Sequence, residues 1–251
     1  MVKTACAWLL AAAAMTAGAA DVEVLSAGAA EVPFHAAASA WERASGHHVK
    51  AAFGPVGELR KRLDAGAAPD VVVVPSEAIG ALAAAGKVDA ATRRDLGVVS
   101  IGAAVRAGAP RPDISTPEAL KRTLIDAKSV TYMDPTRGTS GKFFDESVLP
   151  KLGIRDEVRA KAILGQGGSV AEKVARGEAE IAFQQITELI PVKGVTVLGP
   201  LPDAVQKRTT YSAVLAKQPK HSAEARALLD YLASPAGRKP FLDAGFERPA
   251  S

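Results

Sequence analysis

Hydroxyl and guanidinium side chains gather in a glycine-containing segment that leads into a predicted helix. The segment Asp134–Gly141 (DPTRGTSG) contains Arg137, Thr139 and Ser140. Backbone N–H groups at a helix start bind anions, and an arginine can hold a carboxylate through two parallel donors. Thr139 and Ser140 are equally typical of helix caps, so both interpretations stay open. The segment predicts a site for a small anion, with Arg137 as its charge partner.

A second segment and a strand end carry similar groups. Gly168 and Ser169 open another predicted helix, and Ser169 with Glu172 also fits a capping box. Gln184 and Gln185 supply neutral amides at the end of a predicted strand. Because neighbouring strand residues point to opposite faces, we expect only one of the two amides to face a ligand.

Small residues follow the first two predicted strands. Ser26, Gly28 and Ala29 follow one strand, and Gly54 and Gly57 follow the next. Glycine lets a backbone approach a ligand closely, although it also serves turn geometry alone. We expect these five positions to form the opposite wall of the same site.

The chain shows no spacing typical of a nucleophile with its base. An isomerisation that moves one proton needs a single positioned base, and Glu31, His35 and Glu58 stand near the small-residue loops. No spacing singles one of them out. The sequence predicts neither a metal site nor a cofactor.

The elements that position these residues occur twice. A strand–loop–helix layout with strands at residues 22–25, 49–53 and 70–74 is repeated with strands at 130–133, 162–164 and 180–183. Alternating strands and helices predict an α/β fold, and two further strands, Val98–Val105 and Tyr211–Ala216, flank the second unit. We expect two lobes, each with a mixed sheet flanked by helices, joined by a double hinge around a cleft.

The expected boundaries follow from this layout. Lobe 1 should comprise about 21–100 and 217–251, lobe 2 about 101–216, with connections near Ile101–Arg106 and Lys207–Ser212. The cleft should be lined by residues 26–31, 54–57, 76–77, 134–141, 166–169 and 184–187. Pro240 should kink or interrupt the last helix, which begins at Ser234-Pro235.

The first 20 residues read as a signal peptide. Lys3 precedes an apolar run from Ala5 to Met15 and then small residues, a run too short to span a membrane. Removal of this segment takes away Cys6, the one cysteine, so disulfides and thiolate sites are excluded from the exported chain. A formal net charge of +4, scattered along the chain, does not favour nucleic acid. We expect a periplasmic protein without nucleic-acid partners.

Five segments in order resemble one known family. They are Val24–Ala30 (VLSAGAA), Leu59–Asp70 (LRKRLDAGAAPD), Asp134–Gly141 (DPTRGTSG), Val174–Phe183 (VARGEAEIAF) and Leu228–Phe246 (LLDYLASPAGRKPFLDAGF). Together they resemble the type 2 periplasmic solute-binding proteins, in the branch of the molybdate-binding proteins of ABC importers. The resemblance implies a two-lobed Venus-flytrap fold that captures a small anion between its lobes.

The ligand positions of that branch are altered here. Its molybdate binders use serine hydroxyls, backbone N–H groups and a tyrosine hydroxyl. Those positions fall on Ala29, on the serine-free run Gly54–Gly57 and on Gln185. Because a buried dianion needs charge-assisted hydrogen bonds worth about 1.5–3 kcal/mol each, these residues suit a small polycarboxylate at least as well as molybdate or tungstate.

Two functions follow from these patterns. The favoured one is a monomeric binding protein that captures a small anion for an ABC permease. The alternative is an enzyme similar to aconitate isomerase, which resembles the same branch and moves an allylic proton of a tricarboxylate. A carboxylate ligand would use Arg137 and Gln185, whereas a bare oxyanion hardly requires either. Fold alone does not choose between binding and catalysis.

Overall fold

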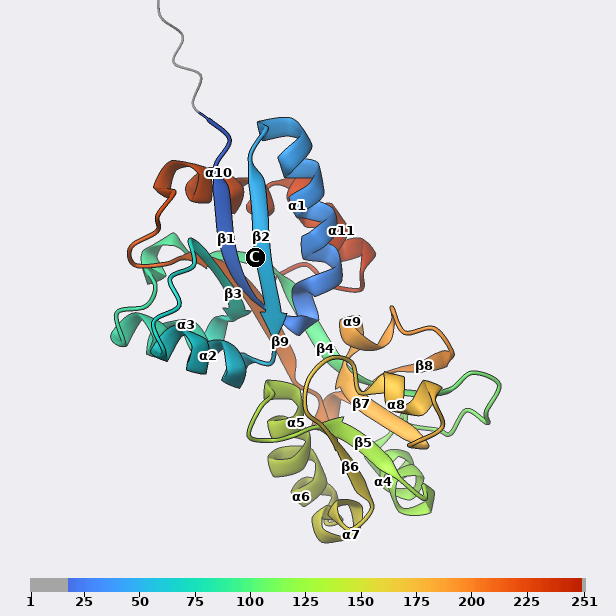
Figure 1. Ribbon diagram of the computed structural model, residues 1–251. Helices are drawn as coiled ribbons and strands as arrows, with labels where there is room; N and C mark the ends of the chain where they lie inside the picture. Colours follow the sequence, from blue (N-terminus) through green and yellow to red (C-terminus); the bar gives the residue numbers. More distant parts are fainter. Residues whose placement is uncertain (1–17, 250–251) are drawn as a thin grey trace, which may run out of the picture.

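The molecule consists of two lobes joined by long strands (Figure 1). The structure is a computed structural model and describes residues 18–249. The predicted signal peptide, residues 1–20, lies outside the described residues apart from its last three. In the described range no helix combines the length and apolar character that a membrane span requires.

The first lobe is a mixed sheet covered by helices. Its elements are β1 (Asp21–Ala27), η1 (Gly28–Ala30), α1 (Glu31–Ser45), β2 (His48–Gly54), α2 (Val56–Asp64), β3 (Val71–Pro75), α3 (Ser76–Ala84), η2 (Ala90–Thr92), the first half of β4 (Arg94–Arg106), β9 (Arg208–Leu215), α10 (Ser222–Ala233) and α11 (Pro235–Asp243). The sheet order is β2-β1-β3-β9-β4, in which β1 pairs parallel with its neighbours and β9 antiparallel. Helices α1, α10 and α11 pack together, and α2 and α3 lie on the other side of the sheet (Figure 1).

The second lobe contains the other half of β4. Its elements are α4 (Pro117–Asp126), β5 (Val130–Met133), α5 (Thr139–Phe143), the π-helix η3 (Phe144–Val148), α6 (Leu149–Leu152), α7 (Arg155–Arg159), β6 (Ala162–Gly165), α8 (Ala171–Ala175), β7 (Ile181–Gln185), α9 (Ile186–Leu189), β8 (Val195–Pro200) and η4 (Asp203–Val205). Strands β5, β6 and β7 are parallel, whereas β4 runs antiparallel to β7 and β8. The expectation of two mixed sheets is confirmed.

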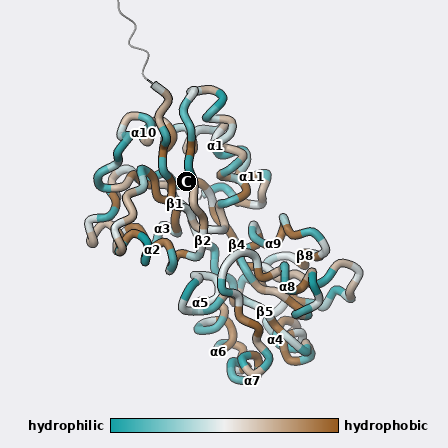
Figure 2. The backbone as a smooth tube through the Cα atoms, viewed as in Figure 1, coloured by the Kyte–Doolittle hydropathy of each residue, from teal (hydrophilic) through white to brown (hydrophobic). Residues whose placement is uncertain are grey.

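Side chains of the second sheet alternate between two cores. Ile101, Ala103 and Val105 of β4 belong to one buried cluster, whereas Ala104 belongs to another. The same alternation places Phe183 and Ala182 of β7 on opposite faces, as the period of a strand requires. Both faces are therefore covered, and Figure 2 shows hydrophobic stretches along the strands inside both lobes.

Strand β4 and the segment that leads into β9 connect the lobes. Strand β4 pairs with β9 from Arg94 to Ser100 and with β7 and β8 from Ile101 onward. All of β9 pairs with β3 or β4 in the first sheet, and its residues Tyr211, Ala213, Val214 and Leu215 lie in the first core. We therefore propose that the first crossing lies at Ser100–Ile101 and that lobe 2 ends near residue 207, earlier than the expected 216.

Capping side chains and glycines mark several helix ends. The Thr116 hydroxyl accepts a hydrogen bond from the Ala119 N–H at 3.1 Å at the start of α4. Gly66 and Gly177 follow α2 and α8 with φ angles of 96° and 78°, a backbone region that favours glycine.

The expected interruption at Pro240 is wrong, because α11 continues through it from Pro235 to Asp243. Phe241 is fully buried and packs against Phe246 with ring centroids 5.2 Å apart. We infer that this burial offsets the hydrogen bond that the proline removes.

Candidate functional site

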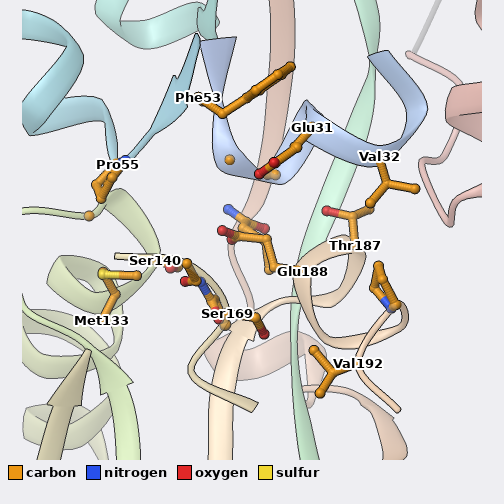
Figure 3. A pocket seen from close by; sticks show the side chains of 18 of the residues that line it. Glu31, Val32, Phe53, Pro55, Met133, Ser140, Ser169, Thr187, Glu188 and Val192 are labelled. Atoms are coloured by element: carbon orange, nitrogen blue, oxygen red, sulfur yellow. The ribbon is translucent and has the colours of Figure 1, made fainter. Parts of the chain in front are cut away.

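A cavity of about 780 Å³ lies between the lobes (Figure 3), within the roughly 300–1,000 Å³ typical of small-molecule sites. The first lobe contributes η1, the start of α1 and the end of β2, and the second contributes the starts of α5 and α8 and the segment from β7 to Lys193. The predicted site residues that line it are Gly28, Ala29, Glu31, Gly54, Thr139, Ser140, Gly168, Ser169, Gln184 and Gln185. Segments far apart in the sequence therefore meet in one cleft.

Three predicted ligand residues lie elsewhere. Ser26 is fully buried and its hydroxyl donates to the Ala27 carbonyl at 3.2 Å. Gly57 and Arg137 line a second, smaller cavity. The Asp134 carbonyl accepts from the Arg137 N–H at 2.9 Å, and the Arg137 carbonyl accepts from the Gly57 N–H at 3.0 Å. Arg137 is thus among the residues that line the cavity beside α2 and α3 and not among those that line the main cleft, where it was predicted.

Two of the three candidate bases also lie outside the cleft lining. The His35 ring packs on the Phe53 ring with centroids 4.8 Å apart. The Glu58 carboxylate lies 3.8 Å from Arg62 on the same helix. Glu31 does line the cleft, at the first turn of α1.

Glu188 is the acidic residue that sequence reasoning missed. It stands on α9 and reaches into the cleft from the second lobe, with Glu31 reaching in from the first (Figure 3). A Cβ atom placed on Gly28 would lie 3.1 Å from Glu188 Oε1, so the carboxyl group lies directly against η1. Burial raises the pKa of Glu188 to about 8, a hydrogen bond from Gln184 opposes the rise, and the charge of Glu31 adds to it. The carboxyl group therefore exists in both protonation states near neutral pH.

The two glutamines have different surroundings. Gln184 accepts from the Val170 N–H at 2.8 Å and donates to the Gly168 carbonyl at 3.1 Å, so it holds the loop before α8. Gln185 is 2% exposed and its Oε1 has no hydrogen-bond partner among the described residues. Thr187 Oγ1 is also buried and has no partner within residues 18–249. Since buried polar atoms are nearly always paired, Gln185 and Thr187 present unused hydrogen-bonding capacity in the cleft wall.

A tyrosine reaches the cleft from an unexpected element. Tyr211 of β9 is buried at the cleft, and burial together with the charge of Glu188 raises the pKa of its hydroxyl.

Of the cations in the lining, Arg176 pairs with Glu178 at 2.6 Å, whereas Lys193 has no ion pair within residues 18–249. The predicted ligand residue Gln185 lies in the same region, but the predicted cleft lining ended at residue 187 and therefore omitted Lys193.

The helix starts differ in detail from the expected pattern. Ser169 Oγ accepts from the Ala171 N–H at 3.3 Å, while Glu172 pairs with Arg176 at 3.5 Å. The reciprocal bond of a capping box is therefore not seen between Ser169 and Glu172 in the described part of the chain.

Within residues 18–249 no three His, Cys, Asp or Glu side chains are grouped as a metal site would need.

Comparisons with known proteins agree with this architecture. Residues 22–247 match the family described as bacterial extracellular solute-binding protein. An aconitate isomerase of Pseudomonas sp is 38% identical over 229 residues, covering 89% of this chain and 86% of that protein. The molybdate-binding protein ModA of Rhodobacter capsulatus is 29% identical over 76% of this chain and 74% of its own.

A solved structure shows the same fold. The periplasmic molybdate-binding protein of Azotobacter vinelandii superimposes with a TM-score of 0.77 at 18% identity, covering 91% of this chain and 100% of that one. The predicted resemblance to type 2 periplasmic binding proteins of the molybdate-binding branch is confirmed. This chain belongs to the bacterial extracellular solute-binding protein family.

Proposed function

We propose that this chain is exported to the periplasm and interconverts cis- and trans-aconitate, or a closely similar unsaturated tricarboxylate, in the cleft between its lobes. The observation that carries the proposal is the Glu188 carboxyl group, which lies in the cleft with a pKa raised to about 8. The 38% identity to an aconitate isomerase supports it, against 29% to a molybdate-binding protein.

The reaction needs one group that takes and returns a proton. A C–H bond of the methylene carbon breaks, the double bond shifts by one carbon, and a new C–H bond forms at the former vinylic carbon. Atoms and electrons balance within the substrate, because one proton leaves and one proton is added. A carboxyl group is an efficient base or acid when its pKa lies near the working pH, and Glu188 meets this condition.

The cleft also carries groups that suit an anionic substrate. The hydroxyls of Thr139, Ser140 and Thr187 and the ammonium group of Lys193 line the same cavity. These groups would hold the substrate carboxylates while Glu188 moves the proton.

The test uses the mature protein with cis-aconitate and follows the vinyl proton by NMR. Glu188→Gln should lower the rate about 10²–10⁴-fold, the usual contribution of a general acid–base, while substrate binding is retained. The parent's kcat/KM should rise with pH and level off above about pH 8, because the ionised carboxylate accepts the proton.

A matched control and a clear contrary outcome accompany this test. Glu157→Gln removes an exposed carboxylate on α7 and should leave the rate unchanged. A Glu188→Gln variant as fast as the parent, or a pH profile flat from 6 to 9, would remove Glu188 from the proton transfer.

A second candidate is the binding protein of an ABC importer, which captures a small anion and delivers it to a permease. The family description and the molybdate-binding relatives favour it. Calorimetry with molybdate, sulfate, citrate and both aconitates separates the two candidates. Tight binding without any conversion of cis-aconitate supports transport, and tight molybdate binding alone would overturn the tricarboxylate proposal.

A further inference from the structure

A second cavity of about 310 Å³ lies beside the main cleft. It is enclosed by α2 and α3 of the first lobe and by the segment 135–142 that leads into α5 of the second. The two cavities share Val56, Gly138 and Thr139 in their walls. The volume is at the lower end of the range for small-molecule sites, so the cavity has room for a small ligand that touches both lobes.

The inner wall of this cavity is apolar. It is formed by buried or partly buried side chains of the first core, namely Leu59, Leu63, Val74, Ala78 and Leu82. An apolar wall of this kind disfavours a second charge on the occupant, since a charge placed there would lose its hydration without a partner.

The outer wall is cationic. Arg60, Arg137 and Lys142 line the cavity, and none of them has an ion pair within residues 18–249. The one lining carboxylate, Glu77, is neutralised by Lys207 at 2.7 Å. Arg137 Nε is buried and finds no hydrogen-bond acceptor among the residues that the structure describes. An arginine without an ion pair on the wall of a largely apolar cavity favours an anionic occupant, because its guanidinium charge has no other partner there in the described range.

We propose that this cavity is a second ligand site that binds an aliphatic monocarboxylate of about four to eight carbons. The carboxylate would accept hydrogen bonds from Arg137, whose planar donors match its geometry. The hydrocarbon chain would lie on Leu59, Leu63 and Leu82. This inference does not depend on the reaction in the main cleft.

Occupation of the second site would affect the main cleft. The Gly57 N–H donates to the Arg137 carbonyl across the lobe boundary at 3.0 Å, so a ligand between α2 and Arg137 stabilises this arrangement of the lobes. Binding at two linked sites is reciprocal. A monocarboxylate should therefore tighten binding of the main-cleft ligand, and that ligand should tighten binding of the monocarboxylate by the same factor.

The test is calorimetric titration of the mature protein with acetate, butyrate, hexanoate and octanoate. Affinity should rise about fourfold with each added methylene, the effect of burying one CH₂ group, until the cavity is full. Arg137→Ala should weaken hexanoate binding at least tenfold. Arg43→Ala removes an exposed arginine at the end of α1 and should leave it unchanged.

A second variant keeps the test independent of any folding defect. Ala81→Phe places a large side chain in the cavity from an exposed position on α3, and it should abolish hexanoate binding without lowering the melting temperature. Three outcomes would overturn the proposal: no saturable binding of any acid in the series, binding that both variants leave intact, or simple competition between hexanoate and trans-aconitate.

Discussion

At the scale of single residues, a substitution of Thr187 should change ligand binding without lowering the stability of the fold. Its hydroxyl is buried in the cleft wall and has no hydrogen-bond partner in the part of the chain that the structure describes. Thr187→Val removes the unpaired hydroxyl at nearly constant shape, so the ligand-free variant should unfold at the same or a higher urea concentration. Binding of trans-aconitate should weaken by about 1.5–3 kcal/mol, the contribution of a hydrogen bond to a charged group.

Calorimetry and urea unfolding measure the two effects separately. Thr196→Val on β8, outside the cleft lining, is the matched control and should change the affinity little. An unchanged affinity in Thr187→Val would mean that the hydroxyl does not contact the ligand.

Residue types alone indicated most of the loops that line the cleft, but not the acidic side chain Glu188 within it. Glycines and hydroxyls at strand ends identified Gly28, Thr139 and Ser169, because parallel strands direct such loops to one edge. Glu188 escaped notice because its pKa depends on burial and on Glu31 from the other lobe. Arg137 lines the second cavity instead of the main cleft because a turn through Asp134 holds its backbone against Gly57 of the other lobe. Both depend on tertiary contacts that no local pattern encodes.

At the scale of elements, Asp145 ties the π-helix η3 to α7. Its carboxylate is fully buried and accepts hydrogen bonds from Arg155 at 2.8 Å, Arg159 at 2.7 Å and Tyr132 at 3.1 Å. Burial by itself would raise the pKa of Asp145, but the hydrogen bonds from Arg159, Arg155 and Tyr132 outweigh it and hold the pKa at about 2. The carboxylate thus stabilises the folded state only while it is ionised.

Asp145→Asn should lower the free energy of unfolding at pH 7 by about 3 kcal/mol, the lower end of the range for breaking a buried pair. The lower end applies because the Arg155 and Arg159 side chains are 36% and 47% exposed and regain water. The contribution is fully present above the unfolded pKa of 3.8 and is lost as the pH falls toward 2. The difference in unfolding free energy between parent and variant should therefore shrink as the pH falls.

Denaturant unfolding at pH 7, 4 and 3 measures this difference in unfolding free energy. Asp156→Asn, an exposed neighbour on α7, should be neutral throughout. A free-energy difference between parent and Asp145→Asn that stays constant from pH 7 to pH 3 would contradict the assigned role of Asp145.

Elements were more predictable from sequence than single side chains. The continuous apolar run Val71–Val74 became the fully buried strand β3, as its two covered faces require. Strand β8 was missed because Val195–Pro200 is only partly buried and pairs with β4 alone. Pro240 was misjudged because the burial of Phe241 is a tertiary effect. Local patterns identify elements with strong periodicity, whereas edges and exceptions depend on packing.

At the scale of the whole molecule, the contact between Gly57 and the turn at Arg137 controls how closely the lobes approach. A Cβ atom on Gly57 would lie 3.0 Å from the Arg137 carbonyl oxygen and 3.2 Å from that of Thr136. Both neighbours are backbone atoms of the other lobe and cannot rotate away. Gly57→Ala should therefore separate the lobes at this edge.

The cost of such overpacking is about 1–3 kcal/mol, and it falls on the arrangement in which both lobes contact a ligand. The dissociation constant of trans-aconitate should therefore rise about tenfold or more, because 1.4 kcal/mol corresponds to a factor of ten. The radius of gyration measured by small-angle scattering at saturating ligand should exceed that of the parent. The unfolding free energy of each lobe should change little, since Gly57 packs against the other lobe rather than into either core.

Gly80→Ala is the matched control, because a Cβ atom there meets nothing within 4 Å. It lies inside α3, where alanine is favoured over glycine by about 0.5–1 kcal/mol, so this variant should be slightly more stable and should bind normally. If Gly57→Ala binds and scatters like Gly80→Ala, the lobes do not close through this contact. The crossing that we propose at Ser100–Ile101 would then have to set the width of the cleft without this contact, since β4 changes its partners there.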